Sequence, residues 1–271
     1  MKTKGEPDPD DLLARGAWEH YADAAYYDHA YRDRADDVAF YRGVARRFGG
    51  PVLELGVGTG RVAVPLASDG VEVVGVDLNP AMLARARERA KEAALPRGRL
   101  SLRRGDLRDF SLGRRFPLIT APFNALLHLY EPDDFRLLRR VRAHLAPGGR
   151  FVFDVRVPQP EELARDPDRP YRARGFVHPT LGKRVRYVEF FRYEPLKQVQ
   201  YVTIRFEPVD GSPAVETLLS QRQIFPAELR ALLALGGLRV ARRMGGFDGR
   251  PLSPDDVDQV IEAVPVDARR R

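Results

Sequence analysis

The chain has 271 residues and contains no cysteine, which excludes disulfide bonds, thiolate zinc sites, iron–sulfur clusters and a cysteine nucleophile. Its 45 lysines and arginines against 38 acidic residues give a net charge of +7, but all except five of these cations are arginines spread among acids. We therefore attribute the charge to a coding bias and predict no nucleic-acid partner. No apolar run is long enough to span a membrane and no apolar signal core opens the chain, so we predict a cytoplasmic protein without a membrane partner.

The first half of the chain alternates short apolar runs with helical patterns. Residues 1–10 are expected to be disordered, and residues 11–48 combine helical periodicity with a cluster of tyrosines. Asn79 and Pro80 are typical of a helix N-cap and of the first helical position. Strands alternating with helices predict right-handed βαβ units and a parallel sheet. The expected strands are 51–55, 71–79, 99–106, 117–123 and 150–157, and the expected helices are 60–68, 80–94 and 132–145.

The pattern changes after residue 157. Three strand-like runs, at 184–193, 197–208 and 214–225, are separated by short turn-like breaks, which predicts an antiparallel meander. The expected elements after the meander are a helix at 225–237, a strand at 238–249 and a last helix at 255–263. We divide the chain accordingly into an N-terminal tail and helical lid (1–48), a cofactor-binding core (49–157), an antiparallel insertion (158–213) and a final core segment with the C-terminal tail (214–271).

A glycine-rich turn joins the first predicted strand to its helix. The glycines are Gly56, Gly58 and Gly60, a spacing of G-x-G-x-G that lets backbone approach a ligand closely. Dinucleotides and S-adenosylmethionine are the two large cofactor classes that use such a turn. The dinucleotide pattern needs a third glycine where this chain has Arg61, and it leaves Glu54 before the loop unexplained.

Acidic residues also end the next two predicted strands. A carboxylate at Asp77 is placed to accept hydrogen bonds from both hydroxyls of a ribose. Asp106, at the end of the third strand, is placed to accept from an adenine amino group. Leu78 and Met82 are candidates to pack on the adenine faces. These groups share the carboxyl ends of parallel strands, where ligands bind in sheets of this kind.

In order, the motifs E-L-G-x-G-x-G, V-D-x-N-P-x-M-L, G-D-L and L-x-P-G-G-R-F-x-x-D resemble those of the class I S-adenosylmethionine-dependent methyltransferases. The resemblance covers residues 50–156. It implies a Rossmann-like α/β fold, in which a seven-stranded, mostly parallel sheet has helices on both faces, with the meander and the N-terminal lid as additions. It also implies S-adenosylmethionine as cofactor, S-adenosylhomocysteine as product, and direct in-line methyl transfer without a metal.

Carried onto this chain, the resemblance assigns cofactor-binding residues. It places Glu54, Gly56 and Gly58 around the methionine end of the cofactor and Asp77 at the ribose. It places Asp106 and Leu107 at the adenine, and the backbone around Ala121 on the methionine side. The chain departs from many relatives in having no acid before the strand at 117–123. It also lacks the N-P-P-Y motif used on base amines and glutamine.

Short local motifs are similar to the small-molecule members, such as the sugar N-methyltransferases and the glycine-type N-methyltransferases. They imply that His128 is the general base or acceptor-orienting group, since an amine or hydroxyl must lose its proton to attack. Tyr27 and Tyr31, in the tyrosine-rich segment, are candidates to close over the sulfonium. The alternatives are that His128 bonds only to backbone and that the tyrosines only pack a helix. His144, before a predicted helix end, is expected to interact with the helix dipole.

The acceptor is expected to be a small molecule, to which methyl transfer occurs at nitrogen or oxygen. Arg184, Arg186 and Arg192 in the meander are candidates to bind an anionic acceptor, but an ordinary solvated face of a lid or of a homodimer sheet is the stronger interpretation. Three other functions remain open: an RNA or protein methyltransferase, a non-catalytic S-adenosylmethionine-binding protein, and an NAD-dependent oxidoreductase, which Arg61 disfavours.

Overall fold

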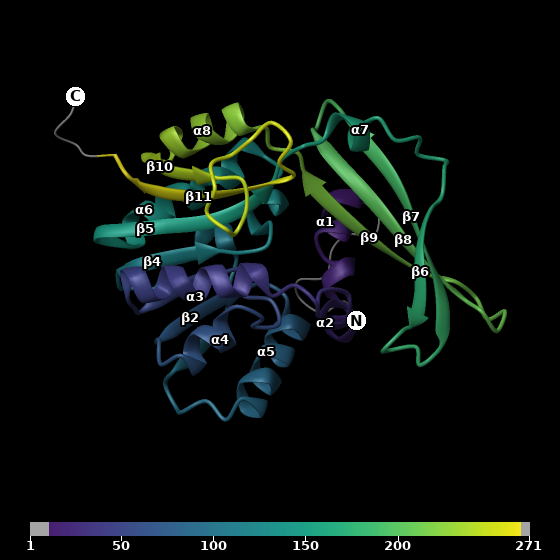
Figure 1. Ribbon diagram of the computed structural model, residues 1–271, viewed down its shortest axis with the longest axis horizontal. Coiled ribbons are helices and arrows are strands. Elements are labelled where there is room, and N and C mark those ends of the chain that lie inside the picture. Colours follow the sequence, from purple (N-terminus) through teal and green to yellow (C-terminus); the bar gives the residue numbers. More distant parts are fainter. Residues whose placement is uncertain (1–10, 267–271) are drawn as a thin grey trace. The chain divides into compact units, whose positions relative to one another are not determined.

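The computed structural model in Figure 1 describes residues 11–266, so the expectation for residues 1–10 lies outside it. The described chain forms two compact units. We call residues 34–157 and 224–266 the core unit, and residues 11–33 and 158–223 the meander unit. Within residues 11–266, no helix combines the length and apolar character needed to cross a membrane.

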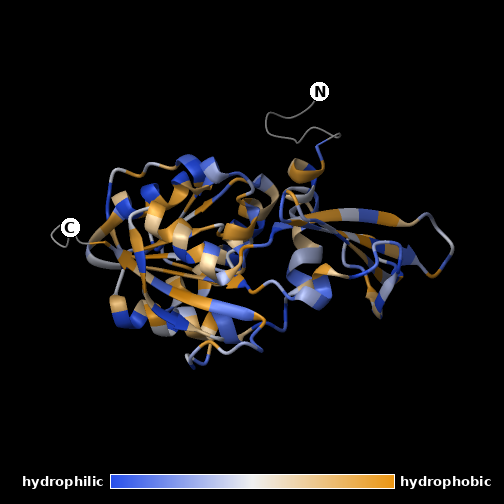
Figure 2. Cartoon of the chain, turned by 90° about the horizontal axis from the view of Figure 1, so that it is seen from above, coloured by the Kyte–Doolittle hydropathy of each residue, from blue (hydrophilic) through white to orange (hydrophobic). Residues whose placement is uncertain are grey.

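The core unit contains a seven-stranded sheet, as predicted. The strand order is β10-β11-β5-β4-β1-β2-β3, and the five strands from β5 to β3 run parallel while β10 and β11 are antiparallel to their neighbours. Hydrophobic residues line these strands in Figure 2, because both faces of the sheet are covered. The bounds are β1 (Val52–Leu55), β2 (Val73–Asp77), β3 (Leu100–Arg104), β4 (Phe116–Ala121), β5 (Leu145–Arg156), β10 (Leu238–Met244) and β11 (Asp258–Pro265).

Helices cover the two faces of this sheet through alternate strand residues. Val52 and Val73 point to the face covered by α3, α4 and α5, whereas Leu53 and Val74 point to the face covered by α6 and α8. Asn79 caps α5 through its side chain, as the sequence predicted. The helices are α3 (Asp36–Phe48), α4 (Ala63–Ser68), α5 (Pro80–Glu92), α6 (Arg136–His144) and α8 (Pro226–Leu235), with short 3₁₀ turns η2 (Leu107–Asp109), η3 (Ala125–His128) and η4 (Pro132–Phe135).

The helix predicted at 255–263 is wrong, because this segment contains strand β11. Residues 259–264 are all buried, and β11 pairs with both β5 and β10. A short apolar run that is buried on every side has no clear period, so it does not separate a strand from a helix. The long-range pairing decides the outcome.

The meander unit contains a four-stranded antiparallel sheet, one strand more than the sequence predicted. The order is β6-β7-β8-β9, with β6 (Tyr171–Val177), β7 (Arg184–Glu194), β8 (Val199–Pro208) and β9 (Val215–Arg222). Strand β6 escaped prediction because it is an edge strand in which no residue is buried. The unit also contains α1 (Leu12–Gly16), η1 (Glu19–Tyr21), α2 (Ala24–Ala30) and α7 (Pro160–Leu163).

Two of the expected domain boundaries differ from this division. The structure divides the chain after residue 33 rather than 48, because α3 packs on the core sheet through Tyr41 and Ala45. It divides the chain after residue 223 rather than 213, because β9 pairs with β8 along its whole length. Gly16 of α1 lies so close to β9 that an added Cβ would come within 2.6 Å of Ser220.

Candidate active site

The glycine loop connects β1 to α4, and its three glycines have different roles. All three have positive φ angles, of 69°, 53° and 75° in chain order. A Cβ at Gly60 would lie 3.1 Å from Val64 and 3.3 Å from Ala86, so this glycine allows close helix packing. A Cβ at Gly58 would have no atom nearer than 4.0 Å. The loop at Gly58 is therefore bare backbone beside open space, which suits a ligand.

Asp77 fastens this loop to the next strand. Its Oδ2 accepts a hydrogen bond of 2.8 Å from the Gly58 N–H, and its Oδ1 accepts one of 2.8 Å from the Asn79 N–H. Burial raises the pKa of the Asp77 carboxyl, and these backbone N–H groups partly offset the effect. Each oxygen keeps acceptor capacity for a further donor, such as a ribose hydroxyl.

Glu54 is buried at the end of β1, with 2% of its surface exposed. Burial raises the pKa of its carboxyl to about 8, although Arg61 and the Ala63 N–H favour the charged form. Its Oε2 has no hydrogen-bond partner within residues 11–266. A buried oxygen without a partner is costly, so a bound donor or an ordered water would stabilise it.

Arg61 closes the glycine loop with a buried ion pair. Its guanidinium donates to both carboxylate oxygens of Asp37 on α3, at 2.7 and 2.5 Å, and Asp37 is fully buried. The guanidinium groups of Arg34 and Arg61 also lie over the ring of Phe123, 4.7 and 5.1 Å from its centroid. Sequence reasoning used Arg61 only to exclude a dinucleotide and missed this role.

The expected adenine edge contains one feature that the sequence did not predict. The carboxylate of Asp106 accepts hydrogen bonds from the Arg108 Nε, at 2.9 Å, and from its Nη2, at 2.6 Å. Arg108 also reaches Asp134, at 3.3 Å. The carboxylate of Asp106 is thus hydrogen-bonded to a guanidinium before any adenine binds. Burial raises the pKa of this carboxyl, but the bonds from Arg108 outweigh burial and lower the pKa overall.

The apolar residues expected at the adenine differ in exposure. Leu78 is 43% exposed and has surface to offer a ligand, whereas Met82 is 1% exposed and belongs to the buried interior. Leu107 reaches the glycine loop, since its Cδ1 lies 3.9 Å from where a Cβ of Gly56 would be. Of the three, Leu78 and Leu107 therefore lie at the surface of the candidate site.

His128 is the last residue of η3, which follows β4 and the expected backbone contact at Ala121. The two preceding residues, Leu126 and Leu127, are buried and anchor the turn, while His128 is half-buried. Its Nδ1 lies 3.3 Å from the hydroxyl of Tyr130. This contact orients one ring nitrogen, and Nε2 is the other nitrogen that can act on a proton.

The other histidine of the core unit has a structural role. His144 ends α6, where its Nδ1 lies 2.8 Å from the Arg140 carbonyl oxygen and its Nε2 accepts from the Leu112 N–H at 3.1 Å. This placement agrees with the expectation that His144 interacts with a helix end. Both ring nitrogens are engaged by backbone groups, so His144 has no free nitrogen for catalysis.

Tyr27 belongs to the meander unit, where its side chain is buried rather than exposed. It is 7% exposed, and its ring contacts the rings of His20, Tyr21 and Tyr31. His178 stacks on Tyr26 in the core of this unit, with ring centroids 5.3 Å apart. The structure thus assembles Glu54, Gly56, Gly58, Asp77, Asp106, Ala121 and His128 in one unit and places Tyr27 in the other.

The arginines proposed for an anionic acceptor lie on the outside of the meander sheet. Arg184 and Arg186 are exposed on β7, and Arg192 lies over the ring of Tyr201, 5.0 Å from its centroid. Gln200, on β8, is buried and donates to the Glu162 carbonyl oxygen. These contacts fit an ordinary solvated face of the meander at least as well as a site that binds an anionic acceptor.

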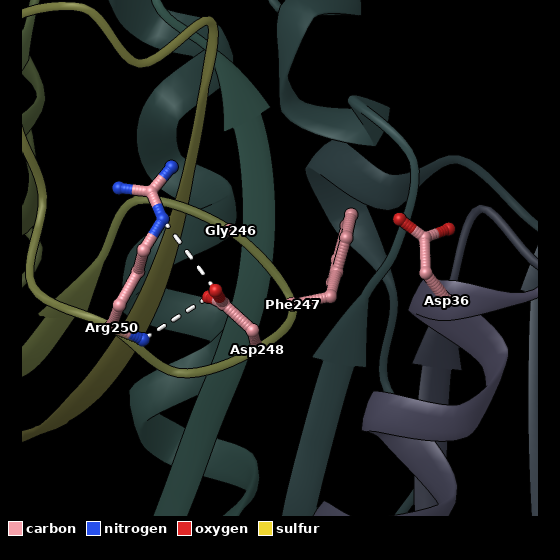
Figure 3. Close-up of a pocket in the computed structure, with 5 residues that line it drawn as sticks. All are labelled: Asp36, Gly246, Phe247, Asp248 and Arg250. Carbon is pink, nitrogen blue, oxygen red and sulfur yellow. Dashed lines mark hydrogen bonds and ion pairs between the residues drawn. The ribbon is translucent and has the colours of Figure 1, made fainter.

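Figure 3 shows a cavity in the core unit, beside the first turn of α3. Its volume is about 400 Å³. The turn that lines it connects β10 to β11, and β11 starts opposite the end of β5, so the cavity lies at the carboxyl edge of the parallel strands. Phe247 faces Phe40, and Arg250 is held by Asp248 and the buried Asp256. The lining residues are Asp36, Gly246, Phe247, Asp248 and Arg250.

Comparison with known proteins agrees with this fold. A family model described as a methyltransferase domain matches residues 52–149. The cypemycin N-terminal methyltransferase of a Streptomyces species is 30% identical over 219 residues, which cover 79% of this chain and 82% of that protein. The chain belongs to the class I methyltransferases whose cofactor is S-adenosylmethionine.

Two further similarities are to other methyltransferases. A dTDP-3-amino-3,6-dideoxy-α-D-glucopyranose N,N-dimethyltransferase of Streptomyces fradiae is 35% identical over 125 residues. That match covers 46% of each protein, less than half the length of this relative. Among solved structures, the CcbJ methyltransferase of Streptomyces caelestis aligns over 91% of this chain and 98% of its own, with a TM-score of 0.77 and 27% identity.

Proposed function

We propose that this protein transfers a methyl group from S-adenosylmethionine to an amine nitrogen of a small molecule. The observation that carries the proposal is the bare glycine loop, fastened by Asp77 at the carboxyl edge of the sheet, with His128 beyond the end of β4. The named relatives that act on an amino sugar and on a peptide N-terminus share an amine as acceptor. We therefore propose an amine as the acceptor group of this protein as well.

The residues of the core unit fit S-adenosylmethionine. Gly58 leaves space above the loop, and both oxygens of Asp77 keep capacity to accept from a ribose. Leu78 offers exposed apolar surface, and Glu54 has a buried oxygen without a partner. We assign the ribose to Asp77, the adenine edge to Asp106 with Leu107, and the methionine end to the loop around Gly56 and the backbone of Ala121.

The chain's own residues have a limited set of tasks in this reaction. When bound, S-adenosylmethionine supplies a methyl group on a positively charged sulfur, which is already a good leaving group. The protein must align the acceptor nitrogen behind the methyl carbon and exclude water. Because an ammonium has no lone pair, the acceptor must also lose a proton. We assign this step to the imidazole of His128, which lies at the end of η3 beyond β4.

Methylation assays with matched acceptors test the proposal. We would incubate the protein with S-adenosylmethionine and either a dTDP-amino sugar, its hydroxyl analogue or a short peptide with a free N-terminus, and detect products by mass spectrometry. Methylation of an amine but not of the hydroxyl analogue supports the proposal. Methylation of the hydroxyl compound alone contradicts it.

A further inference from the structure

The chain leaves β4 through two consecutive residues in the left-handed region. Phe123 has a φ angle of 55° and Asn124 has a φ angle of 63°. Neither is glycine, and an aromatic residue rarely adopts this conformation because its Cβ is crowded by the backbone. Such strain persists only where surrounding groups impose it, and it concentrates at functional sites.

A single buried carboxylate binds both strained residues. Asp154, on β5, accepts a hydrogen bond from the Phe123 N–H at 2.9 Å and from the Asn124 N–H at 3.3 Å. The same carboxylate accepts from the Tyr41 hydroxyl of α3 at 2.7 Å. Asp154 is 3% exposed, so few water molecules can replace these donors. Burial raises the pKa of its carboxyl to about 6, and the bound donors oppose this.

Asn124 adds a second link to the same strand. Its side-chain Oδ1 accepts a hydrogen bond of 2.7 Å from the backbone N–H of Arg156, at the end of β5. The turn is thus held to β5 from two sides, by its own backbone N–H groups and by its own side chain. The backbone of Phe123 and Asn124 is therefore tied to β5.

The strained turn sets the position of residues 123–128, which we call the wall of the candidate site. Ala125 follows it directly, and a Cβ at Gly56 would lie 3.0 Å from the Ala125 Cβ, so the start of η3 presses on the glycine loop. The ring of Phe123 packs under Arg61, which ends that loop. His128 is the last residue of the same short η3. A rotation at Phe123 or Asn124 would therefore move the wall and His128 together.

We propose that Asp154 is a positioning residue, whose carboxylate holds Phe123 and Asn124 in the left-handed conformation and so fixes the wall of the methyl-transfer site against the glycine loop. The inference rests on the proposed function, because the wall matters only if the loop binds S-adenosylmethionine. It assigns Asp154 no contact with the cofactor or the acceptor. Its effect is carried by the turn alone.

The test compares Asp154→Asn with the wild type by calorimetric titration of S-adenosylhomocysteine and by amide hydrogen exchange of residues 121–128. Asparagine keeps the shape but has one acceptor oxygen and one amide NH₂ group, which only donates, so at least one of the three donors loses its acceptor. We expect affinity to fall by about tenfold and the 121–128 amides to exchange faster. Asp258→Asn is the matched control: Asp258 lies opposite Arg156 and acts on Asp154 only through its charge, so both readouts should stay unchanged.

A second variant keeps the test decisive if Asp154→Asn does not fold. Tyr41→Phe removes one donor and leaves both backbone hydrogen bonds, so we expect a milder loss of affinity, of about twofold to threefold. A residue that only stabilises the fold would leave the affinity of folded Tyr41→Phe unchanged.

The outcomes separate this inference from the proposed function. If the wild type binds S-adenosylhomocysteine and folded Asp154→Asn or Tyr41→Phe binds it equally well, the positioning role is overturned and the proposed function stands. If the wild type binds S-adenosylhomocysteine neither alone nor in the presence of an amine acceptor, the proposed function fails. In that case unchanged exchange of the 121–128 amides in Asp154→Asn shows that Asp154 does not hold the turn either, and faster exchange shows that it does.

Discussion

Asp77 and Gly58 are joined by a hydrogen bond of 2.8 Å between the carboxylate Oδ2 and the backbone nitrogen. The bond links the end of β2 to the loop that follows β1, across neighbouring parallel strands. One carboxylate therefore has two tasks: it shapes the bare loop, and it keeps acceptor capacity for a ligand hydroxyl. The loop and the ribose site cannot be altered independently.

The first prediction follows from this double task. Asp77→Ala should weaken binding of S-adenosylhomocysteine by about 1.5–3 kcal/mol, because a charged acceptor for the ribose is lost together with the support of Gly58. Calorimetric titration measures the change. Asp69→Ala is the control, since Asp69 pairs with Arg42 after α4 and should leave the affinity unchanged. Wild-type affinity in Asp77→Ala would remove Asp77 from the cofactor site.

The second prediction separates two histidines of the core unit. His128→Ala should lower methyl transfer by about 10²–10⁴-fold, the usual contribution of a general base, and leave S-adenosylhomocysteine binding nearly intact. His144→Ala should instead lower stability by about 1–2 kcal/mol, because the Leu112 N–H loses its acceptor, without changing turnover in the folded protein. Turnover assays and urea unfolding of both variants measure this difference. Equal turnover in His128→Ala and wild type would make His128 structural.

The third prediction concerns pH. The pKa of Glu54 is raised to about 8 in the folded protein, from 4.5 for an unperturbed carboxyl, so between these values the folded state keeps a proton that the unfolded state has released. Stability therefore falls as pH rises through this window, by up to about 1.4 kcal/mol per pH unit. The pKa of the Asp154 carboxyl is raised from 3.8 to about 6, which adds to the loss of stability at the acidic end of this window.

Urea unfolding of wild type and Glu54→Gln at about pH 7, 7.5 and 8 measures this effect, because Asp154 has largely titrated by then and Glu54 dominates the difference. Glutamine does not titrate, so the variant should lose the part of the slope that belongs to Glu54. Parallel slopes for the two proteins would show that Glu54 is ionised in the folded state.

The fourth prediction concerns the buried ion pair at the end of the glycine loop. Asp37→Ala should destabilise the protein by about 3–5 kcal/mol, because it leaves the Arg61 guanidinium without its carboxylate in a largely buried position. The exposed pair of Arg42 and Asp69 is the comparison, and its loss should cost far less. Thermal or urea unfolding measures both. Similar losses in the two variants would contradict the idea that burial makes the Arg61 pair important.

The local order of the glycine loop, β2 and α5 could be predicted from the sequence because it depends on neighbouring residues. Gly58 and Gly60 need positive φ angles, and Asn79 with Pro80 starts a helix, whatever the rest of the chain does. Strand β11 could not be predicted in the same way. Its identity comes from pairing with β5, which is distant in the sequence.

The positions of the candidate site residues could be predicted to the same extent. Asp77 ends β2 and Asp106 follows the end of β3, as the strand pattern predicted, so both lie at the carboxyl edge of the sheet. Asp154 lies within β5, and its proposed role depends on Tyr41 and on the φ angles of Phe123 and Asn124, which no local pattern reveals. Arg108 was missed because its pairing with Asp106 gives no periodic signal.

The measurement that tests the central claim most directly is calorimetric titration of the full chain with S-adenosylhomocysteine, with NAD as the paired control. The account predicts micromolar binding of S-adenosylhomocysteine and no binding of NAD. The titration is repeated in the presence of amine acceptors, so that a site that closes only around both ligands is also detected. Binding of NAD, or failure to bind S-adenosylhomocysteine both with and without the amines, would contradict the account.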